Sequence, residues 1–514
     1  PAGGEAIERA PVNETGYRST SGRRVLTALA AMAIVTIGLA GYVWVTRNPG
    51  DPSARASVRS MAVLPFKTLG EIEQEGYLEL GLADVLITTL SNSKEINVRP
   101  TSAILKYNRS EQDPIEIGRE MKVDAVLEGS IQRVDDRIRV TVRLLNVNQR
   151  APLWAGKFDE PAEDILKVQD SISSRVASAL RLNLAGADGA ALAKHYTDNP
   201  DAFNLYLKGR FFWNKRTVEG YWKAIEHFEK AVALDPDYAL AYTGIADSYA
   251  LLQQRDALTS EEAFPKAEQA ASKALAIDET LAEAHASMGL IKSIYHMDIA
   301  GTEKHLRRAI ELNPGYAPAR GWYGLHLLKT RRFEESEAEL RRAQELDPTS
   351  LNVAIYLTWH YYYSRQYDRA IEEARKALEL EPDTHTAYLV ISWSYEQKRL
   401  YDHAVDAALT RMAILKMERE SQLKAAYEER GIDGFWRKYI EVLKEWSLER
   451  SRQEYVIARC YALLGKYDLA LKELEAVYRD RSGWANWAGA EPAFDGLRSD
   501  ERFVALLRRM GLVS

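Results

Sequence analysis

Between residues 59 and 184 the hydrophobic pattern alternates between strand and helix periods. Residues 59–66 (RSMAVLPF) form a short apolar run closed by a proline, which predicts a buried strand. Residues 77–90 carry apolar side chains three and four positions apart, at Leu78, Leu82, Val85, Leu86 and Leu90. This spacing predicts a helix with one apolar face.

The rest of this stretch predicts a small sheet with covering helices. The pattern indicates a strand and turn at 96–102, a helix at 114–121, strands at 123–133, 138–147 and 152–158, and a helix at 164–184. Asp135-Asp136 separates two alternating runs, which is typical of a β-hairpin. The predicted order is β-α-β-α-β-β-β-α, an α/β domain.

An uncharged run lies near the start of the chain. Residues 25–45 contain no charged side chain and would span roughly 32 Å as a helix, about the thickness of a hydrocarbon core. Arg23 and Arg24 precede the run, so we expect a transmembrane helix at 23–47 with the N-terminus inside. A cleaved signal peptide and a buried core helix are the alternatives. Residues 1–22 have the composition of a disordered tail and 48–58 that of a linker.

From about residue 200 the chain repeats itself. Pro314, Pro348 and Pro382 follow ELN, ELD and ELE at intervals of 34 residues. Small or apolar side chains recur at repeat positions 7, 8, 20 and 27, with proline at 32. This pattern resembles the tetratricopeptide repeat, and it predicts stacked pairs of antiparallel helices that form an all-α superhelix. Residues 412–449 depart from the pattern, although they are predicted to be helical.

The α/β stretch also carries a family resemblance. SMAVLPF, YLELGLADVLITTL, IGREMKVDAVLEGSIQR, RIRVTVRLLN, APLWAGKFDE and DILKVQDSIS resemble, in this order, the domain similar to the amino-terminal domain of TolB and to FlgO. The resemblance implies the architecture found after a transmembrane helix in CadC-type transcriptional regulators and in some bacterial kinases and adenylate cyclases. It implies no catalytic residue.

The tetratricopeptide resemblance suggests a binding groove. Positions 2, 5, 9, 12 and 13 of the first helix in such repeats line the concave face. In the copies that begin at 351 and 385, these positions give a candidate peptide-binding groove of Asn352, Ile355, Trp359, Tyr362, Tyr363, Thr386, Leu389 and Trp393. Exposed Trp and Tyr are favoured binding anchors. The alternative is that these aromatics pack against the insertion or the C-terminal segment.

Composition narrows the remaining classes of function. The 514 residues include 68 Lys and Arg against 74 Asp and Glu, a net charge of -6, so we expect no nucleic acid to be bound by this chain. The single cysteine, Cys460, permits no intrachain disulfide and is interpreted as a core residue. The chain has no phosphate-binding glycine motif, metal-ligand spacing or catalytic triad signature. We therefore expect no enzyme, no cofactor and no metal.

These observations combine into one functional hypothesis. The chain is predicted to be a single-pass sensor or interaction protein of the bacterial inner membrane, of the CadC regulator type. Its N-terminus would be cytoplasmic and its bulk periplasmic or otherwise extracytoplasmic, and its repeats would bind proteins or peptides. The winged-helix domain of such regulators is not in this sequence. The alternatives are the membrane-distal part of a kinase and a free-standing scaffold.

The predicted domain boundaries are 1–22 tail, 23–47 transmembrane helix, 48–58 linker, 59–184 TolB-like domain, 185–200 linker and 201–514 repeat array with a C-terminal cap.

Overall fold

Six strands form one mixed sheet in the first part of the described chain. The computed structural model describes residues 58–69, 76–93, 95–108, 110–161, 165–180, 196–255, 257–445, 450–480 and 482–513. The strands are β1 (Ser60–Val63), β2 (Lys67–Thr68), β3 (Asn97–Val98), β4 (Ala125–Val134), β5 (Arg137–Asn146) and β6 (Ala151–Pro161). Their order in the sheet is β3-β1-β4-β5-β6, with β2 beside β4. The eight predicted elements occur in the predicted order, and the short strand β2 was not predicted.

Parallel and antiparallel pairs meet in this sheet. β1 is parallel to β3 and to β4, whereas β4, β5 and β6 form an antiparallel meander. The helices of the domain are α2 (Gly76–Ser91), α3 (Thr101–Ile104), α4 (Pro114–Glu120) and α5 (Ile165–Ala179), with the 3-10 turn η2 (Leu105–Tyr107). α2 and α5 pack against the sheet and against each other. The helical turn at α3 occupies the place where the sequence predicted only a turn after the second strand.

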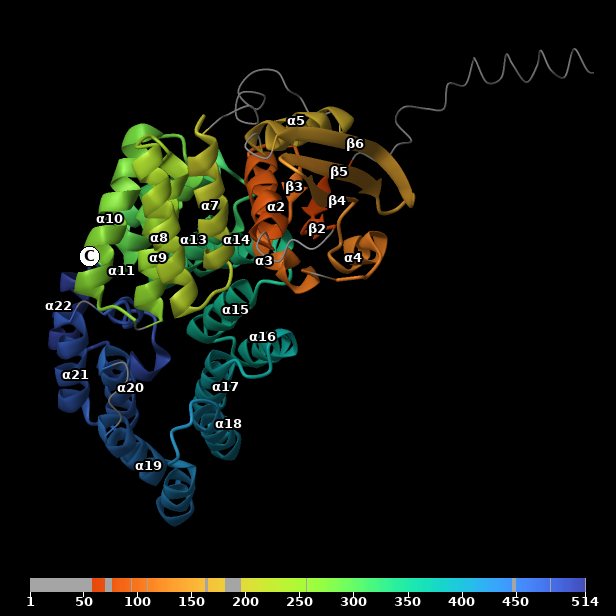
Figure 1. Cartoon of the computed structure of the whole chain (residues 1–514). Coiled ribbons are helices and arrows are strands. Elements are labelled where there is room, and N and C mark those ends of the chain that lie inside the picture. The colour runs from red at the N-terminus through yellow and green to blue at the C-terminus, as the bar shows by residue number, and fades with distance from the viewer. Residues whose placement is uncertain are drawn as a thin grey trace, which may run out of the picture. The chain divides into compact units, whose positions relative to one another are not determined.

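Pairs of antiparallel helices make up the repeat array, as the 34-residue period predicted (Figure 1). The pairs are α7 (Pro200–Trp213) and α8 (Val218–Leu234), α9 (Ala239–Gln254) and α10 (Ser260–Ile277), α11 (Ala282–Ile294) and α12 (Ile299–Leu312), α13 (Ala317–Lys329) and α14 (Phe333–Leu346), α15 (Leu351–Tyr363) and α16 (Tyr367–Leu380), and α17 (His385–Gln397) and α18 (Tyr401–Ile414). The first helices of successive pairs also contact one another. We call the surface that they form the first-helix face.

The turn between the paired helices has the same conformation in three successive repeats. Arg331, Arg365 and Arg399, spaced 34 residues apart, have φ values of 62°, 64° and 60°, and Gly465 in a later pair has 68°. This left-handed conformation reverses the chain between two helices, and glycine adopts it at the lowest steric cost. These turns recur with the 34-residue period of the repeats, so successive helix pairs have the same geometry.

The helices of a pair approach closely where the repeat has its small residues. A Cβ atom on Gly324 would lie 2.6 Å from Leu340 Cγ, closer than carbon atoms can pack. Ser336 Oγ donates a hydrogen bond to the Gly324 carbonyl at 2.8 Å, and Ser392 Oγ donates likewise to the Ala404 carbonyl. The small side chains predicted at positions 8 and 20 therefore lie in the contact between paired helices.

The end of the array is less regular. α19 (Glu420–Glu445) is interrupted at Arg430 and Gly431, where the backbone leaves the helical conformation. α20 (Arg450–Leu463) and α21 (Tyr467–Arg479) then form a last pair. The C-terminal segment, residues 482–513, follows with the 3-10 turns η4 (Ala485–Trp487) and η5 (Pro492–Leu497) and the helix α22 (Glu501–Arg509).

The α/β domain and the first repeats share a hydrophobic core. One continuous cluster of buried side chains extends from Met61 in β1 to Ile291 in α11. α2 packs directly on α7, and a Cβ atom on Gly81 would lie 3.2 Å from Leu207 Cβ. Residues 58–514 accordingly cluster as one compact unit.

The predicted membrane localisation is not supported. In the part of the chain that the structure describes, no helix is both long enough and apolar enough to cross a bilayer. The apolar helix α2 has 16 residues, or about 24 Å, which is shorter than a hydrocarbon core. This finding contradicts the predicted localisation of an inner-membrane protein with an extracytoplasmic bulk. The run at 25–45 on which that localisation rested lies outside the described residues.

Candidate functional site

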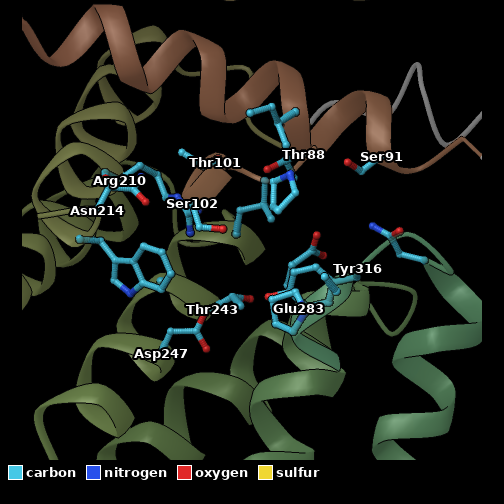
Figure 2. Close-up of a pocket in the computed structure, with 18 of the residues that line it drawn as sticks. Thr88, Ser91, Thr101, Ser102, Arg210, Asn214, Thr243, Asp247, Glu283 and Tyr316 are labelled. Atoms are coloured by element: carbon cyan, nitrogen blue, oxygen red, sulfur yellow. Dashed lines mark hydrogen bonds between the residues drawn. The ribbon is translucent and has the colours of Figure 1, made fainter. Parts of the chain in front are cut away.

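The α/β domain covers part of the first-helix face and encloses a cavity there (Figure 2). The cavity has two adjacent chambers of about 110 Å³ and 130 Å³. The residues that line both chambers are Pro100, Ser102, Trp213, Arg216, Asp247, Tyr316, Ala317 and Pro318. We call this space the interdomain cavity. Figure 2 shows Thr88, Thr101 and Ser102 on the α/β side, facing Thr243, Asp247 and Glu283 on the array side.

A buried ion pair fixes one wall of the cavity. Arg210 of α7 contacts Asp84 of α2 at two points, with Nε–Oδ2 at 2.6 Å and Nη2–Oδ1 at 3.0 Å. Thr101 Oγ1 donates a third hydrogen bond to Asp84 Oδ1 at 2.5 Å. Asp84 is 1% exposed, and this two-point geometry satisfies both of its oxygens. The contact therefore anchors the first helix of the array to the α/β domain.

A second set of polar contacts closes the opposite side. Arg99 donates from Nη1 to the carbonyl oxygen of Leu346 at 2.9 Å, and from Nε to that of Met121 at 3.1 Å. Ser102 Oγ donates to Asp347 Oδ2 at 2.7 Å. The bonds to Leu346 and Asp347 connect the α/β domain to the end of α14, more than a hundred residues beyond α7, whereas the bond to Met121 holds the Arg99 side chain within its own domain. The domain is thus held at both ends of the surface that it covers.

Charged side chains of both signs face the cavity. Burial is the main cause that raises the pKa of Asp247 to about 6, although Ser287 Oγ donates a hydrogen bond to its Oδ1. Burial also raises the pKa of Glu283. The guanidinium of Arg216 stacks 3.8 Å from the centroid of the Trp213 ring, and burial lowers the pKa of this arginine. The wall can therefore interact with a cation and an anion at the same time.

Three of the residues lining the cavity have a buried polar atom without a hydrogen-bond partner among the residues that the structure describes. The atoms are Trp213 Nε1, Asn214 Oδ1 and Asn313 Nδ2. The first and third are donors and the second is an acceptor. Unsatisfied buried groups are rare in folded proteins and call for a specific explanation.

The eight residues predicted to form a peptide groove have different environments. Ile355, Trp359, Tyr362, Tyr363, Leu389 and Trp393 are buried, Thr386 is half-buried and Asn352 is exposed. Of the eight, Asn352 alone lines the interdomain cavity, in its second chamber. The aromatic side chains do not form an open surface in this structure. A role for them in binding a partner stays a prediction.

The C-terminal segment covers these aromatics. Trp359 is 7% exposed and its ring lies 6.1 Å from Trp484 and 6.2 Å from Trp487. Tyr363 stacks on Trp487 with ring centroids 4.7 Å apart. The alternative left open by the sequence, that the aromatics pack against the C-terminal segment, is what the structure shows.

A buried polar network lies beside the aromatic cluster. Glu491 accepts hydrogen bonds from Tyr362 Oη at 2.6 Å and from Arg459 Nε at 3.1 Å. Arg459 also pairs with Glu396, whose other oxygen accepts a bond from Trp436 Nε1 at 2.8 Å. Arg459 and Glu491 are almost fully buried. Removing one member of such a network leaves an uncompensated charge, so it holds the C-terminal segment in place.

The single cysteine has the environment of a core residue. Cys460 is 2% exposed, and burial raises the pKa of its thiol to about 12. The thiol is therefore protonated at neutral pH, which makes it a poor nucleophile. The interpretation of Cys460 as a packing residue is confirmed.

Sequence reasoning missed the interdomain cavity, although the repeat positions contained the signal. Gly209 and Ala246 occupy position 8 in their repeats, so Arg210 and Asp247 occupy position 9, which lines the concave face. Glu283 occupies position 2 of the next repeat. Applying to the repeats before residue 317 the rule used for the later copies would have found all three. The sequence gives no comparable signal that the α/β domain covers them.

Family models match segments in both parts of the chain. Residues 57–175 match the second domain of the HilA/YgeH-like transcriptional regulators. Residues 300–350 and 359–418 match the tetratricopeptide repeat. The repeat prediction is confirmed, and the α/β part is similar to a domain of a transcriptional regulator. Its TolB-like or FlgO-like identity stays a prediction.

Two curated relatives match parts of the chain. The protein named "Putative adenylate cyclase 3" of Rhizobium meliloti is 27% identical over 187 residues, which is 36% of this chain and 32% of the relative. Transcriptional regulator HilA of Salmonella typhimurium is 23% identical over 290 residues, 55% of this chain and 50% of HilA. The chain therefore spans between a third and half the length of these relatives.

Solved structures give weaker likenesses. PilW, a type IV pilus biogenesis factor, is 19% identical, with 43% of this chain and 97% of PilW covered and a TM-score of 0.35. A monomeric IFIT1 mutant is 13% identical, with 61% and 76% covered and a TM-score of 0.38. Scores this low support no inference.

Proposed function

We propose that this chain is the partner-binding part of a bacterial transcriptional regulator of the HilA-like type. The similarity of residues 57–175 to the second domain of these regulators carries the proposal. The tetratricopeptide repeats support protein or peptide partners, because stacked helix pairs provide an extended binding surface. The chain would act by binding, without catalysis and without contacting DNA itself.

The packing of the two parts is consistent with a regulatory module. The α/β domain is held on the array by the Asp84–Arg210 pair and by the Arg99 contacts. A change in one part can therefore affect the other through groups already in contact. We propose that partner binding to the array is coupled to the α/β domain through this contact.

Expression of the chain in trans tests this proposal. In the source bacterium, surplus copies of the binding part should compete with the intact regulator for its partner. We expect a defined set of transcripts to change when the wild-type chain is expressed. The control is Ala343→Trp, which disrupts a fully buried helix contact. Identical transcript profiles for the wild type and the control would contradict the proposal.

A nucleotide cyclase context is the second candidate. The similarity to the Rhizobium meliloti protein favours it. The same cells distinguish the two functions, since a cyclase partner predicts a change in cellular cyclic AMP. A change in transcripts at constant cyclic AMP would favour the regulator.

A further inference from the structure

The charges of the interdomain cavity are only partly neutralised by the protein. Arg210 is already paired with Asp84. Arg216, Asp247 and Glu283 also line the first chamber, and none of the ion pairs among the described residues involves them. Arg216 and Asp247 influence each other through space, but the ion pair that neutralises Arg210 has no equivalent between them. Arg216 is hydrogen-bonded to Tyr221 and Asp247 accepts a bond from Ser287, but these neutral partners do not balance their charges. Among the described residues, one cation and two carboxylates therefore have no oppositely charged group in contact.

The unsatisfied polar atoms of the cavity wall also include both donors and an acceptor. Trp213 Nε1 and Asn313 Nδ2 are donors that require an acceptor, such as a carboxylate oxygen. Asn214 Oδ1 is an acceptor that requires a donor, such as an ammonium group. The cavity wall thus lacks both kinds of partner.

The size of the cavity limits the occupant. Each chamber is somewhat smaller than the roughly 150 Å³ cavity that accommodates benzene in a protein core. Together the chambers have room for a molecule of several heavy atoms. Apolar side chains such as Leu240 and Tyr316 complete the lining, so the occupant can also carry a short apolar part.

We propose that the interdomain cavity is a binding site for a small zwitterion, a free α-amino acid. Its carboxylate would pair with Arg216 and its ammonium with Asp247 and Glu283. Two-sided charge recognition in a cavity inside the protein favours a ligand that supplies both charges over one that supplies either alone. The inference does not depend on the proposed function, since binding is measured on the purified chain.

The site would join the two parts of the molecule. Thr101 and Ser102 come from the α/β domain, whereas Asp247 comes from the array (Figure 2). Arg216, which follows α7, also belongs to the array side. A ligand that contacts both sides binds the assembled form better than the separated form. It should therefore raise the unfolding temperature in proportion to the logarithm of its concentration.

Calorimetric titration of the full chain tests the proposal. The probes are L-leucine, L-glutamate and L-lysine, with n-butylamine as an amine without a carboxylate and n-butyrate as a carboxylate without an amine. We expect at least one amino acid to bind at least tenfold more tightly than both single-charge probes. Equal binding of an amino acid and n-butylamine would overturn the zwitterion assignment. If no probe binds at 10 mM, with an unchanged unfolding temperature, the cavity holds water only and the proposal fails.

Two variants with matched controls test whether the ligand binds at Arg216 and Asp247. Arg216→Gln should weaken amino acid binding by about tenfold or more, and so should Asp247→Asn. The controls are Arg437→Gln and Asp433→Asn, which make the same chemical changes at exposed positions of α19. They should bind as the wild type does. Circular dichroism confirms that each variant is folded. Wild-type affinity in both folded cavity variants would contradict the site.

Discussion

Arg210 of α7 and Asp84 of α2 form a two-point ion pair, through which the repeat array contacts the α/β domain. Asp84 is almost completely buried and Arg210 lies next to the interdomain cavity. The pair lies where repeat position 9 meets the covering domain. Its loss should therefore affect the stability of both parts.

Arg210→Met should lower the free energy of unfolding by about 3–5 kcal/mol, because it leaves the Asp84 carboxylate buried without its cation. The double variant Arg210→Met/Asp84→Leu should recover part of this loss, since it removes both charges. Urea denaturation followed by circular dichroism measures the three values. A single variant as stable as the wild type would show that the pair does not hold the domains together.

Asp247→Asn should stabilise the ligand-free chain at neutral pH. The pKa of Asp247 is raised to about 6 in the folded chain, against an ordinary value of 3.8. The folded chain thus holds this proton more tightly than the unfolded chain, and the group makes stability fall as pH rises from about 4 through 6. The gain should be up to about 2 kcal/mol, since Asp247 keeps some contact with solvent.

Thermal unfolding at pH 5 and pH 7.5 measures this effect. The gain in the Asn variant should be larger at pH 7.5 than at pH 5. The pKa values of the buried residues His326 and His360 are lowered to about 4, so these two groups make the folded chain less stable on acidification. Their contribution is common to both proteins and cancels in the comparison. An equal gain at both pH values would show that the Asp247 proton is not involved.

Trp359→Ala should destabilise the chain by about 3–5 kcal/mol, because its ring packs among Trp393, Trp484 and Trp487. Trp222→Ala is the matched control, since Trp222 is 41% exposed and should cost far less. Thermal unfolding compares the two. If Trp359→Ala retained wild-type stability, the aromatic cluster would again be a candidate for an open binding surface.

Ala343→Trp should lower the unfolding temperature much more than Glu334→Ala. Ala343 is fully buried between the helices of its pair, whereas Glu334 is exposed on the same helix. Overpacking at such a contact costs roughly 1–3 kcal/mol. Differential scanning calorimetry of both variants checks the assigned register, and similar values would argue against it.

Local patterns in the sequence were sufficient to predict the longer elements of the fold, but not the short elements β2 and α3. The alternation on either side of Asp135-Asp136 corresponds to the β4–β5 hairpin, and the 34-residue period corresponds to the stacked pairs. Gly324 illustrates the reason, since its lack of a side chain is required by a contact only 16 residues away. Patterns of this kind depend on neighbours that are close in the chain.

The segments that cover the first-helix face, the α/β domain and the C-terminal segment, could not be identified from such local patterns. Arg99 contacts Leu346 across 247 residues, and Tyr362 contacts Glu491 across 129. The repeat rule identifies which side chains face inward, but it does not identify what lies on them. For the aromatics from Trp359 to Trp393, the sequence left open both a binding groove and packing against the C-terminal segment, and it could not decide between them because Trp484 and Trp487 lie more than 90 residues further along the chain.

The central claim is that the α/β domain covers the first-helix face, and cross-linking tests it most directly. Ser102 Oγ lies 2.7 Å from Asp347 Oδ2 across the contact. In a Cys460→Ser background, a short bismaleimide should join the cysteines of Ser102→Cys/Asp347→Cys within a single chain. It should leave Ser102→Cys/Glu428→Cys unjoined, because α19, which carries the exposed Glu428, lies far from the α/β domain at the other end of the array (Figure 1). Peptide mapping by mass spectrometry detects the product. The account would be contradicted if the Ser102→Cys/Asp347→Cys variant formed no intramolecular cross-link. It would also be contradicted if the two variants were cross-linked in equal yield.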